Sequence, residues 1–243
     1  MKRLLLLAIV APTLVPPALV AQPSPKVADA VVPVVGSTRG QSNSNFKTEL
    51  QLANSTDTDS RGWLIYRPGN LVRRFDLAPF TTLSFADVVG EMGGTGLGTL
   101  DILLDAGSLP TIVARAYDDQ PTGTTGVTVP AIAVEDALTT NDVRMLIVPR
   151  DLIRYRFNIG ARALTGGATL HIHVRTATGT TRNLRALELE EHEFLQQPGD
   201  TFAGIALHPD DSIEIKIAEG RCVVYATTVD NQTNDSAIQV LAR

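Results

Sequence analysis

The sequence predicts an all-β protein made of two tandem, antiparallel β-sandwich-like domains. Short apolar runs with a two-residue period dominate the chain, and clusters of Gly, Pro, Asn, Asp and Thr separate them. Only residues 86–92 resemble a helix, so little is available to connect parallel strands. The order of the runs occurs twice: 72 positions separate Phe46 from Asp118, and 75 separate Tyr155 from Asp230. A single sandwich with pseudo-twofold halves is the alternative architecture.

The first half contains eight segments that we expect to be strands. Each is a short run rich in Val, Ile, Leu, Thr or aromatic residues and is bounded by turn-forming residues. The glycine-rich segment 93–98 ends the expected helix at 86–92. The expected strands are residues 31–35, 46–53, 63–66, 71–77, 81–85, 99–104, 111–117 and 127–134.

The second half repeats this order at low identity. YRFNIGA corresponds to FKTELQL, TLHIHV to WLIY, and TRNLRALEL to LVRRFDL. The boundary falls near residues 136–142, which gives domains at 31–136 and 142–243. The expected strands are residues 143–148, 155–161, 169–174, 181–189, 212–217, 222–229 and 237–242.

The N-terminus has the pattern of a secretory signal peptide. Lys2 and Arg3 precede an apolar stretch at 4–21 that ends in small residues, and its three prolines argue against a permanent membrane helix. We expect cleavage after Ala21, so that residues 1–21 are the signal peptide and 22–30 a linker. The protein is therefore expected to be secreted or periplasmic. An uncleaved N-terminal anchor is the alternative.

Charge, hydrophobic segments and cysteine content exclude several kinds of partner and covalent link. The formal net charge is −5 and no run of basic residues occurs, so a nucleic-acid phosphate backbone is not an expected ligand. No other segment is long and apolar enough for a transmembrane helix in the mature chain. The single cysteine, Cys222, cannot form an intramolecular disulfide, and we expect it to pack as a small hydrophobic side chain.

A similar acidic stretch joins the last two strands of each half. It begins at Asp118 in the first half and at Asp230 in the second, each followed by an Asx residue. Side chains of this kind fix turns by accepting hydrogen bonds from backbone amides one or two residues further on, which is the favoured interpretation. The alternative is a calcium loop, with oxygen ligands from Asp230, Asn231, Asn234 and Asp235.

Three histidines are the candidates for a transition-metal site. His171 and His173 alternate along a predicted strand and so point to the same face, and His192 could supply a third ligand if its segment pairs nearby. The favoured alternative is a solvated strand face, with Leu170 and Ile172 pointing inward.

One resemblance covers most of the mature chain. It rests on VPVVGSTRGQSNSNFKTELQLANSTD, which contains Phe46-Lys47-Thr48-Glu49-Leu50 and Asn54-Ser55, and on Asp230-Asn231-Gln232-Thr233-Asn234-Asp235 near the end. These segments resemble an uncharacterised group of secreted bacterial proteins with duplicated β-sandwich-like units that end in a D-N-x-T-x-D motif. The resemblance implies a duplicated, exported β protein and no particular activity. The first copy departs from the motif at Asp119 and Pro121.

The leading hypothesis is therefore a non-enzymatic exported protein that binds or scaffolds a protein or polysaccharide at the cell envelope or outside it. We assign no catalytic residue and no cofactor. A metal-binding protein or metal-dependent enzyme using His171, His173 and His192 is one alternative, with a metal ion as its cofactor. A carbohydrate-binding module using Trp63 is another.

Overall fold

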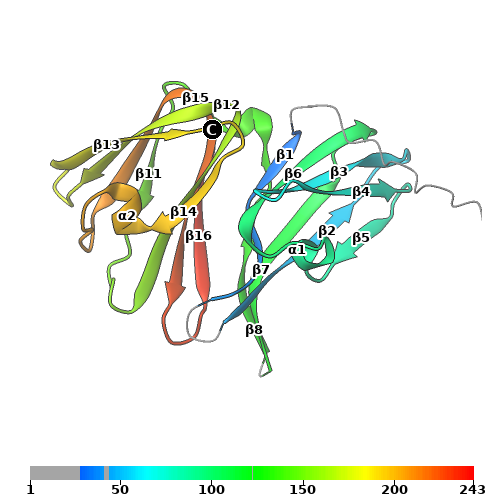
Figure 1. Cartoon of the computed structure of the whole chain (residues 1–243), viewed down its shortest axis with the longest axis horizontal. Coiled ribbons are helices and arrows are strands. Elements are labelled where there is room, and N and C mark those ends of the chain that lie inside the picture. The colour runs from blue at the N-terminus through cyan, green and yellow to red at the C-terminus, as the bar shows by residue number, and fades with distance from the viewer. Residues whose placement is uncertain (1–27, 41–43, 122) are drawn as a thin grey trace, which may run out of the picture.

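The computed structural model describes residues 28–40, 44–121 and 123–243. The predicted signal peptide and residues 22–27 of the predicted linker lie outside this part of the chain. The described residues form two antiparallel sheets with two short helices, α1 (Val88–Glu91) and α2 (Gly199–Ala203), and one 3-10 turn, η2 (Val134–Asp136). This confirms the predicted all-β, sandwich-like fold (Figure 1). Neither helix could cross a membrane, and the rest of the described chain holds no helix that could.

The first sheet has nine strands in the order β4-β3-β6-β1-β2-β7-β8, with β5 paired to β2 and β9 paired to β1. Its strands are β1 (Ala30–Arg39), β2 (Asn45–Ala53), β3 (Ser60–Arg67), β4 (Leu71–Leu77), β5 (Thr82–Phe85), β6 (Gly96–Ala106), β7 (Thr111–Gln120), β8 (Gly123–Val129) and β9 (Ile132–Ala133).

Strand β1 divides this sheet into two layers. Most of β1 pairs with β6, whereas its last two residues, Thr38 and Arg39, pair with β2. The register against β6 shifts between Val32 and Val35, around Pro33, which has no N–H to donate to the ladder. Thr48 of β2 stabilises the part of β1 where its pairing changes from β6 to β2. Its Oγ1 accepts a hydrogen bond of 2.8 Å from the amide of Gly36. The two layers enclose a core that includes Leu50, Leu64, Phe75, Leu100 and Ala114.

The second sheet has seven strands in the order β10-β15-β12-β13, with β11 and β16 paired to β15 and β14 paired to β12. Its strands are β10 (Leu138–Thr139), β11 (Val143–Ile147), β12 (Tyr155–Arg175), β13 (Thr181–Leu189), β14 (Phe194–Pro198), β15 (Ser212–Asp230) and β16 (Ser236–Leu241).

Strands β12 and β15 are long and pass through both layers of the second sandwich. The first part of β12 pairs with β14 and the end of β15, and its last part pairs with β13 and the start of β15. Gly166, Gly167 and Gly220 have positive φ where the register between the two strands shifts. The inward faces of both parts of β12 belong to one hydrophobic core.

Several predicted boundaries differ from the structure. Residues 155–161 and 169–174 were expected as separate strands, but the Gly166-Gly167 pair bends a continuous strand instead of ending it. The same holds for 212–217 and 222–229, which form β15. Strand β14 and helix α2 were not predicted, because FLQQP and GDTFA carry no clear two-residue or helical pattern. The expected helix at 86–92 is α1, where the Asp87 side chain accepts a hydrogen bond from the amide of Gly90.

The two sheets contact each other directly (Figure 1). Tyr225 of β15 is fully buried and packs into the hydrophobic core of the first sheet. A further buried cluster combines Val31 of the first sheet with Leu164 and Val223 of the second, and with Val134 and Ala137 of the connection between them. Burial of apolar side chains from both halves in the same clusters stabilises their association.

Candidate functional site

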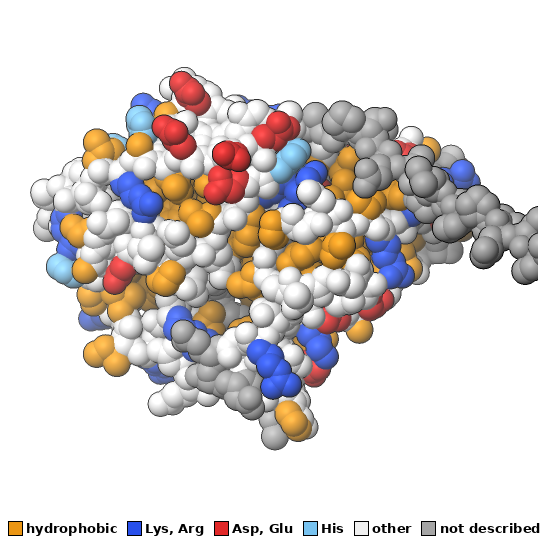
Figure 2. All heavy atoms as spheres, in the orientation of Figure 1, with side chains coloured by type: hydrophobic (Ala, Val, Ile, Leu, Met, Phe, Trp, Pro, Cys, Tyr) orange, Lys and Arg blue, Asp and Glu red, His pale blue; other side chains and the backbone are white. Residues whose placement is uncertain are grey.

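A cleft lined by both sheets is the main candidate binding site. Its volume is about 400 Å³. Strands β1 and β2 provide one wall, β12, β14, β15 and β16 the other, and β6, β7 and β8 also contribute. In Figure 2, which shows one face of the molecule, hydrophobic side chains gather across the middle, where the two halves meet. The lining residues are Val34, Val35, Gly36, Thr38, Arg39, Gly40, Phe46, Lys47, Thr48, Leu97, Ala116, Val127, Arg156, Asn158, Gln196, Thr227, Val229 and Ser236.

The charged residues of this lining are all cationic: Arg39, Lys47 and Arg156. Among the described residues, no Asp or Glu belongs to the lining. The remaining residues are aliphatic, aromatic, amide, hydroxyl or glycine. The cleft therefore offers apolar contact together with hydrogen-bond donors and positive charge, a composition typical of ligand sites.

Lys47 and Arg156 occupy similar places in their strands, each one residue after an aromatic residue. Their strand neighbours Phe46 and Tyr155 lie opposite Asp118 and Asp230. Lys47 Nζ forms an ion pair of 2.7 Å with Asp119 Oδ2. This hydrogen bond is the largest of the causes that raise the pKa of Lys47. A direct carboxylate partner therefore balances the charge of this lysine.

Arg156 has a different set of partners. Its Nη1 donates to Asn231 Oδ1 at 3.0 Å, and its Nη2 donates to Asn234 Oδ1 at 3.0 Å. Both acceptors are neutral amides, and no ion pair of Arg156 is found within the described part of the chain. Since a guanidinium has five N–H groups, three donors remain after these two bonds.

The acidic stretch at Asp230 is a turn whose oxygens have partners. Asp230 Oδ1 accepts hydrogen bonds from the amides of Gln232 and Thr233 at 2.8 and 3.2 Å, as the turn interpretation predicts. Its Oδ2 accepts from Arg154 Nε at 2.8 Å. This bond to Arg154 is the main reason that the pKa of Asp230 falls to about 2.

The other candidate calcium ligands also have partners in this turn. The side-chain oxygens of Asn231 and Asn234 accept hydrogen bonds from Arg156. Asp235 Oδ1 accepts a hydrogen bond of 3.0 Å from the amide of Ser236. A cation bound by these atoms would have to displace at least one guanidinium donor.

The end of β7, which carries Asp118 and Asp119, meets the Asp230 turn at the boundary between the sheets. Asn234 Nδ2 donates to Asp118 Oδ2 at 3.1 Å, and Asp118 Oδ1 accepts from the amide of Asn45 at 2.6 Å. Asp118 is 1% exposed. The turn interpretation therefore describes Asp230 but not Asp118, which lies within β7, accepts from the distant amide of Asn45 and joins the two halves.

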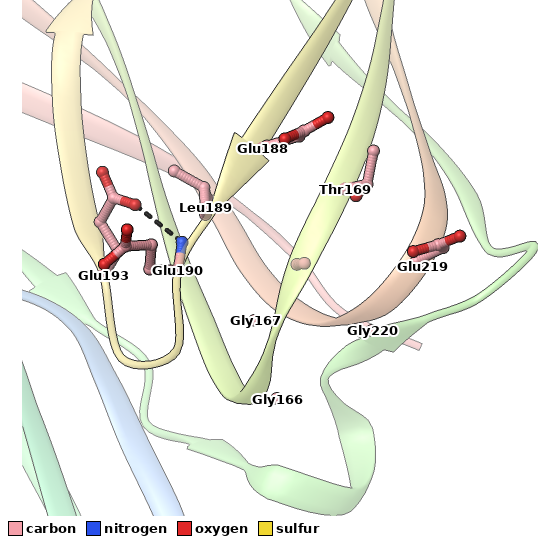
Figure 3. Close-up of a pocket in the computed structure, with 10 residues that line it drawn as sticks. Gly166, Gly167, Thr169, Glu188, Leu189, Glu190, Glu193, Glu219 and Gly220 are labelled. Carbon is pink, nitrogen blue, oxygen red and sulfur yellow. Dashed lines mark hydrogen bonds between the residues drawn. The ribbon is translucent and has the colours of Figure 1, made fainter.

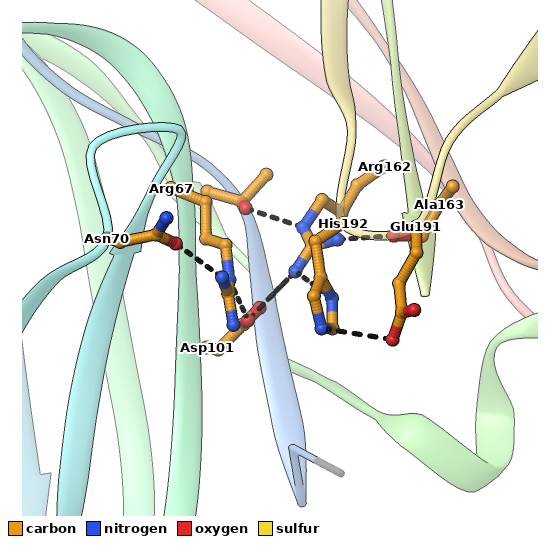
Figure 4. Close-up of polar contacts among 8 residues, drawn as sticks. Arg67, Asn70, Asp101, Arg162, Ala163, Glu191 and His192 are labelled. Atoms are coloured by element: carbon orange, nitrogen blue, oxygen red, sulfur yellow. Dashed lines mark hydrogen bonds and ion pairs between the residues drawn. The ribbon is translucent and has the colours of Figure 1, made fainter. Parts of the chain in front are cut away.

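A buried ionic network lies at a second place on this boundary (Figure 4). Arg162 of β12 is 0% exposed and Asp101 of β6 is 1% exposed. Arg162 Nη2 donates to both carboxylate oxygens of Asp101, at 2.9 and 2.8 Å, and its Nε donates to Thr99 at 3.0 Å. Arg67 Nε also contacts Asp101, at 2.9 Å. Burial lowers the pKa of Arg162 despite the carboxylate beside it.

The structure does not bring His171, His173 and His192 together. His171 and His173 lie half-buried on one face of β12, while Leu170 and Ile172 point into the core. His173 Nδ1 lies 3.3 Å from Glu214 Oε1. His192 lies in the turn before β14, with Nδ1 3.3 Å from Arg162 Nη2. Burial and the nearby Arg67 and Arg162 lower the pKa of His192. The described residues hold no group of three or more His, Cys, Asp or Glu side chains placed to bind a metal ion.

A second cavity, of about 440 Å³, lies where β12 and β15 bend (Figure 3). Four glutamates line it: Glu188, Glu190, Glu193 and Glu219. Glu193 Oε2 accepts a hydrogen bond of 2.8 Å from the amide of Glu190. Figure 3 shows Glu188 and Glu219 on separate strands from the Glu190–Glu193 turn. These carboxylates form an acidic surface, and none of the described residues that line the cavity is Lys, Arg or His.

Trp63 and Cys222, which the sequence also singles out, are held by contacts within the fold. Trp63 of β3 is half-buried, its Nε1 donates to Asp105 Oδ2 at 2.6 Å, and the guanidinium of Arg74 lies 5.7 Å from its ring centre. Cys222 is buried, and desolvation raises the pKa of its thiol to about 12. A thiol with that pKa is protonated near neutral pH and unreactive.

The Arg162–Asp101 pair and the cleft are not among the features predicted from the sequence. One signal for the pair was present: Arg162 and Asp101 are lone charges within the apolar runs GARAL and TLDILL. Opposite charges at two such positions are expected to pair when both strands are buried. The cleft had no comparable signal, because its lining comes from strands scattered along the chain.

Comparison with known proteins gives no functional assignment. No protein-family model matches the chain, and no curated protein matches it at a significant level. Among solved structures, vicilin from Corylus avellana (hazelnut) aligns with a TM-score of 0.23 and 8% identity, over 89% of this chain and 75% of the vicilin chain. Similarity at this level supports no argument about function.

Proposed function

We propose that the protein is an exported, non-enzymatic β protein that binds or scaffolds a partner at or outside a bacterial cell envelope, and that the cleft between the sheets is its binding site. The observation that carries the proposal is that both halves contribute to one lining of apolar, amide and cationic groups. A volume of about 400 Å³ falls within the range of ligand pockets, about 300–1,000 Å³. The partner is a protein or a polysaccharide.

Export is part of the proposal, and the sequence supports it. Residues 1–21 combine Lys2 and Arg3 with an apolar stretch and a small-residue end. Intact mass measurement of the protein recovered from a bacterial host's periplasm or medium tests this. The expected mass is that of a chain beginning at Gln22. A chain that keeps Met1 and remains inside the cell would contradict export.

A tandem repeat is also part of the proposal. The pairing schemes of the two sheets support it: β2 pairs with β5 and β7 as the first part of β12 pairs with β14 and the end of β15. Likewise, β3 pairs with β4 and β6 as the last part of β12 pairs with β13 and the start of β15. On this basis the cleft lies between two copies of one ancestral unit.

The binding proposal is tested by nuclear magnetic resonance titration of the mature protein with peptides and with envelope oligosaccharides. We expect at least one ligand to shift the side-chain amide signals of Asn158 and Gln196, with no change in the ligand itself. The cleft-filling variant Thr227→Trp should lose the shifts. Shifts that map outside the cleft, or conversion of a ligand to product, would refute the proposal.

A further inference from the structure

We infer that the cleft takes the C-terminal end of a peptide chain, with Arg156 binding the terminal carboxylate and the aliphatic lining taking the last side chain. This inference rests on the proposed function, because it specifies the ligand of the same cleft. It begins from a difference between the corresponding positions Lys47 and Arg156.

The difference lies in the residue that each cation contacts. Lys47 is matched by Asp119, a carboxylate at 2.7 Å. The residue corresponding to Asp119 in the second half is Asn231, so Arg156 has an amide oxygen in its place. The single change from a carboxylate to an amide leaves a positive charge at the cleft wall without a directly bonded anion.

The guanidinium of Arg156 is also held in a fixed orientation. Two bonds of 3.0 Å to Asn231 and Asn234 fix its plane, and Asn234 is anchored in turn by Asp118 at 3.1 Å. A fixed guanidinium with unused N–H groups is suited to bidentate binding of a carboxylate. The nearby Asp118 is 1% exposed and already bonded, so it does not supply that anion at the cleft surface.

The rest of the lining favours a peptide over other carboxylates. Asn158 lies opposite Thr227 and Pro198 in the sheet, and its side-chain amide has no hydrogen-bond partner within the described ranges. Gln196 Oε1 accepts from Tyr225 at 2.5 Å, which leaves its NH₂ group available. A peptide can bond these amides through its backbone, whereas a fatty-acid chain would bury them unsatisfied.

Apolar contacts complete the site. Leu97 is 38% exposed and lines the cleft together with the half-buried Ala116 and Val127. They form a surface for one aliphatic side chain, and the nearly buried Val34, Val35 and Val229 complete the lining. Phe46 is the only aromatic residue of the described lining, whereas stacking of a sugar ring usually uses aromatic faces. Capture of a C-terminal carboxylate is an established mode of peptide recognition.

The test uses the mature protein and two N-terminally dansylated pentapeptides, Gly-Ser-Ala-Val-Leu with a free carboxylate and the same peptide with a C-terminal amide. Fluorescence anisotropy is expected to show at least tenfold weaker binding of the amide. Arg156→Gln should weaken binding of the free acid at least tenfold and leave the amide peptide unchanged. A merely structural role for Arg156 would weaken both peptides equally, which would overturn the inference.

Control variants keep the test decisive. Arg175→Gln lies on the same strand, and its guanidinium pairs with Glu214 away from the cleft, so both peptides should bind it as they bind the wild type. Arg156→Lys retains the charge without the planar fork and should bind the free acid with intermediate affinity. Circular dichroism confirms that each variant is folded before binding is measured.

The outcome also separates this inference from the proposed function. Dodecanoate or a galacturonate oligomer that binds the cleft while neither peptide binds would overturn the inference and leave a binding cleft. Equal affinity for the free acid and the amide, with both lost in Thr227→Trp, would do the same. If no ligand of any class reaches the cleft, the proposed function fails as well.

Discussion

Arg162 shows most clearly how one residue couples the two halves. A buried guanidinium is costly to desolvate unless a carboxylate and other acceptors satisfy it. Asp101 provides that carboxylate, Thr99 accepts from Nε, and the carbonyl of Ala163 accepts from Nη1. Arg162 and Asp101 are both buried, so each compensates the charge of the other.

Substitution of Arg162 by Met should therefore destabilise the protein strongly. We expect the free energy of unfolding to fall by about 3–5 kcal/mol, because Asp101 would remain buried with Arg67 as its one remaining charged partner among the described residues. Urea denaturation measures the change. Adding Asp101→Asn to Arg162→Met should recover part of the loss.

The exposed cation Arg61 provides the comparison for this prediction. Its side chain is 44% exposed and pairs with Asp59 and Asp76, so Arg61→Met should change stability far less. Equal losses in Arg61→Met and Arg162→Met would show that burial of the ionic pair is not the cause.

Asp230 predicts a dependence of stability on acid pH. Its pKa in the folded protein is about 2, against 3.8 for the free side chain. A depressed pKa means that the carboxylate contributes stability in full above about pH 3.8 and loses it as the pH falls through 2. The difference in unfolding free energy between wild type and Asp230→Asn should therefore shrink as the pH falls from 5 to 2. Urea titrations at several pH values measure it, and a constant difference would contradict the assignment.

At the scale of the element, the bends of β12 and β15 decide the shape of the second sandwich. Gly220 has φ of +75°, and a Cβ there would lie 2.1 Å from the carbonyl oxygen of Gly167. The two strands therefore approach each other closely where both bend. Only glycine combines the left-handed conformation with this close approach.

Gly220→Ala should accordingly destabilise the protein more than a glycine substitution at an open site. Gly179 is the matched position, since its φ is +83° and a Cβ would meet nothing within 4 Å. We expect Gly179→Ala to cost about 1–2 kcal/mol from backbone conformation alone. Gly220→Ala should cost about 1–3 kcal/mol more from the clash, as measured by thermal unfolding. Similar losses for the two variants would refute the close approach.

The sequence predicted strand positions better than strand continuity. FKTELQLA, WLIY and LVRRFDL became β2, β3 and β4 because their apolar periodicity and bounding turns are local properties. The sequence predicts 155–161 and 169–174 as separate strands, because composition alone does not distinguish a bend within a strand at Gly166-Gly167 from a break between two strands. The cleft and the Arg162–Asp101 pair depend on contacts between residues about 60 or more positions apart, which no local pattern encodes.

For the whole molecule, shared burial predicts that the two sheets unfold together. Tyr225 of the second sheet packs in the core of the first, and a separate buried cluster draws on both. Trp63, the only tryptophan, lies in β3 and reports on the first sheet. Its fluorescence should change at the same urea concentration as the far-ultraviolet circular dichroism of the whole chain.

A core variant in the second sheet makes this prediction stricter. Phe202 of α2 is 0% exposed, and Phe202→Ala should cost about 3–5 kcal/mol. Because the sheets share buried contacts, the Trp63 transition should move to lower urea along with the circular dichroism signal. A Trp63 midpoint that stays unchanged would show that the first sheet unfolds independently.

The ionic link between β6 and β12 predicts how the two halves behave when they are produced as separate fragments. A fragment ending near residue 136 would display Asp101 without Arg162, and the complementary fragment would display an arginine and Tyr225 on a newly wetted face. Each fragment made alone is therefore expected to aggregate, whereas co-expression of the two should yield a soluble, non-covalent heterodimer.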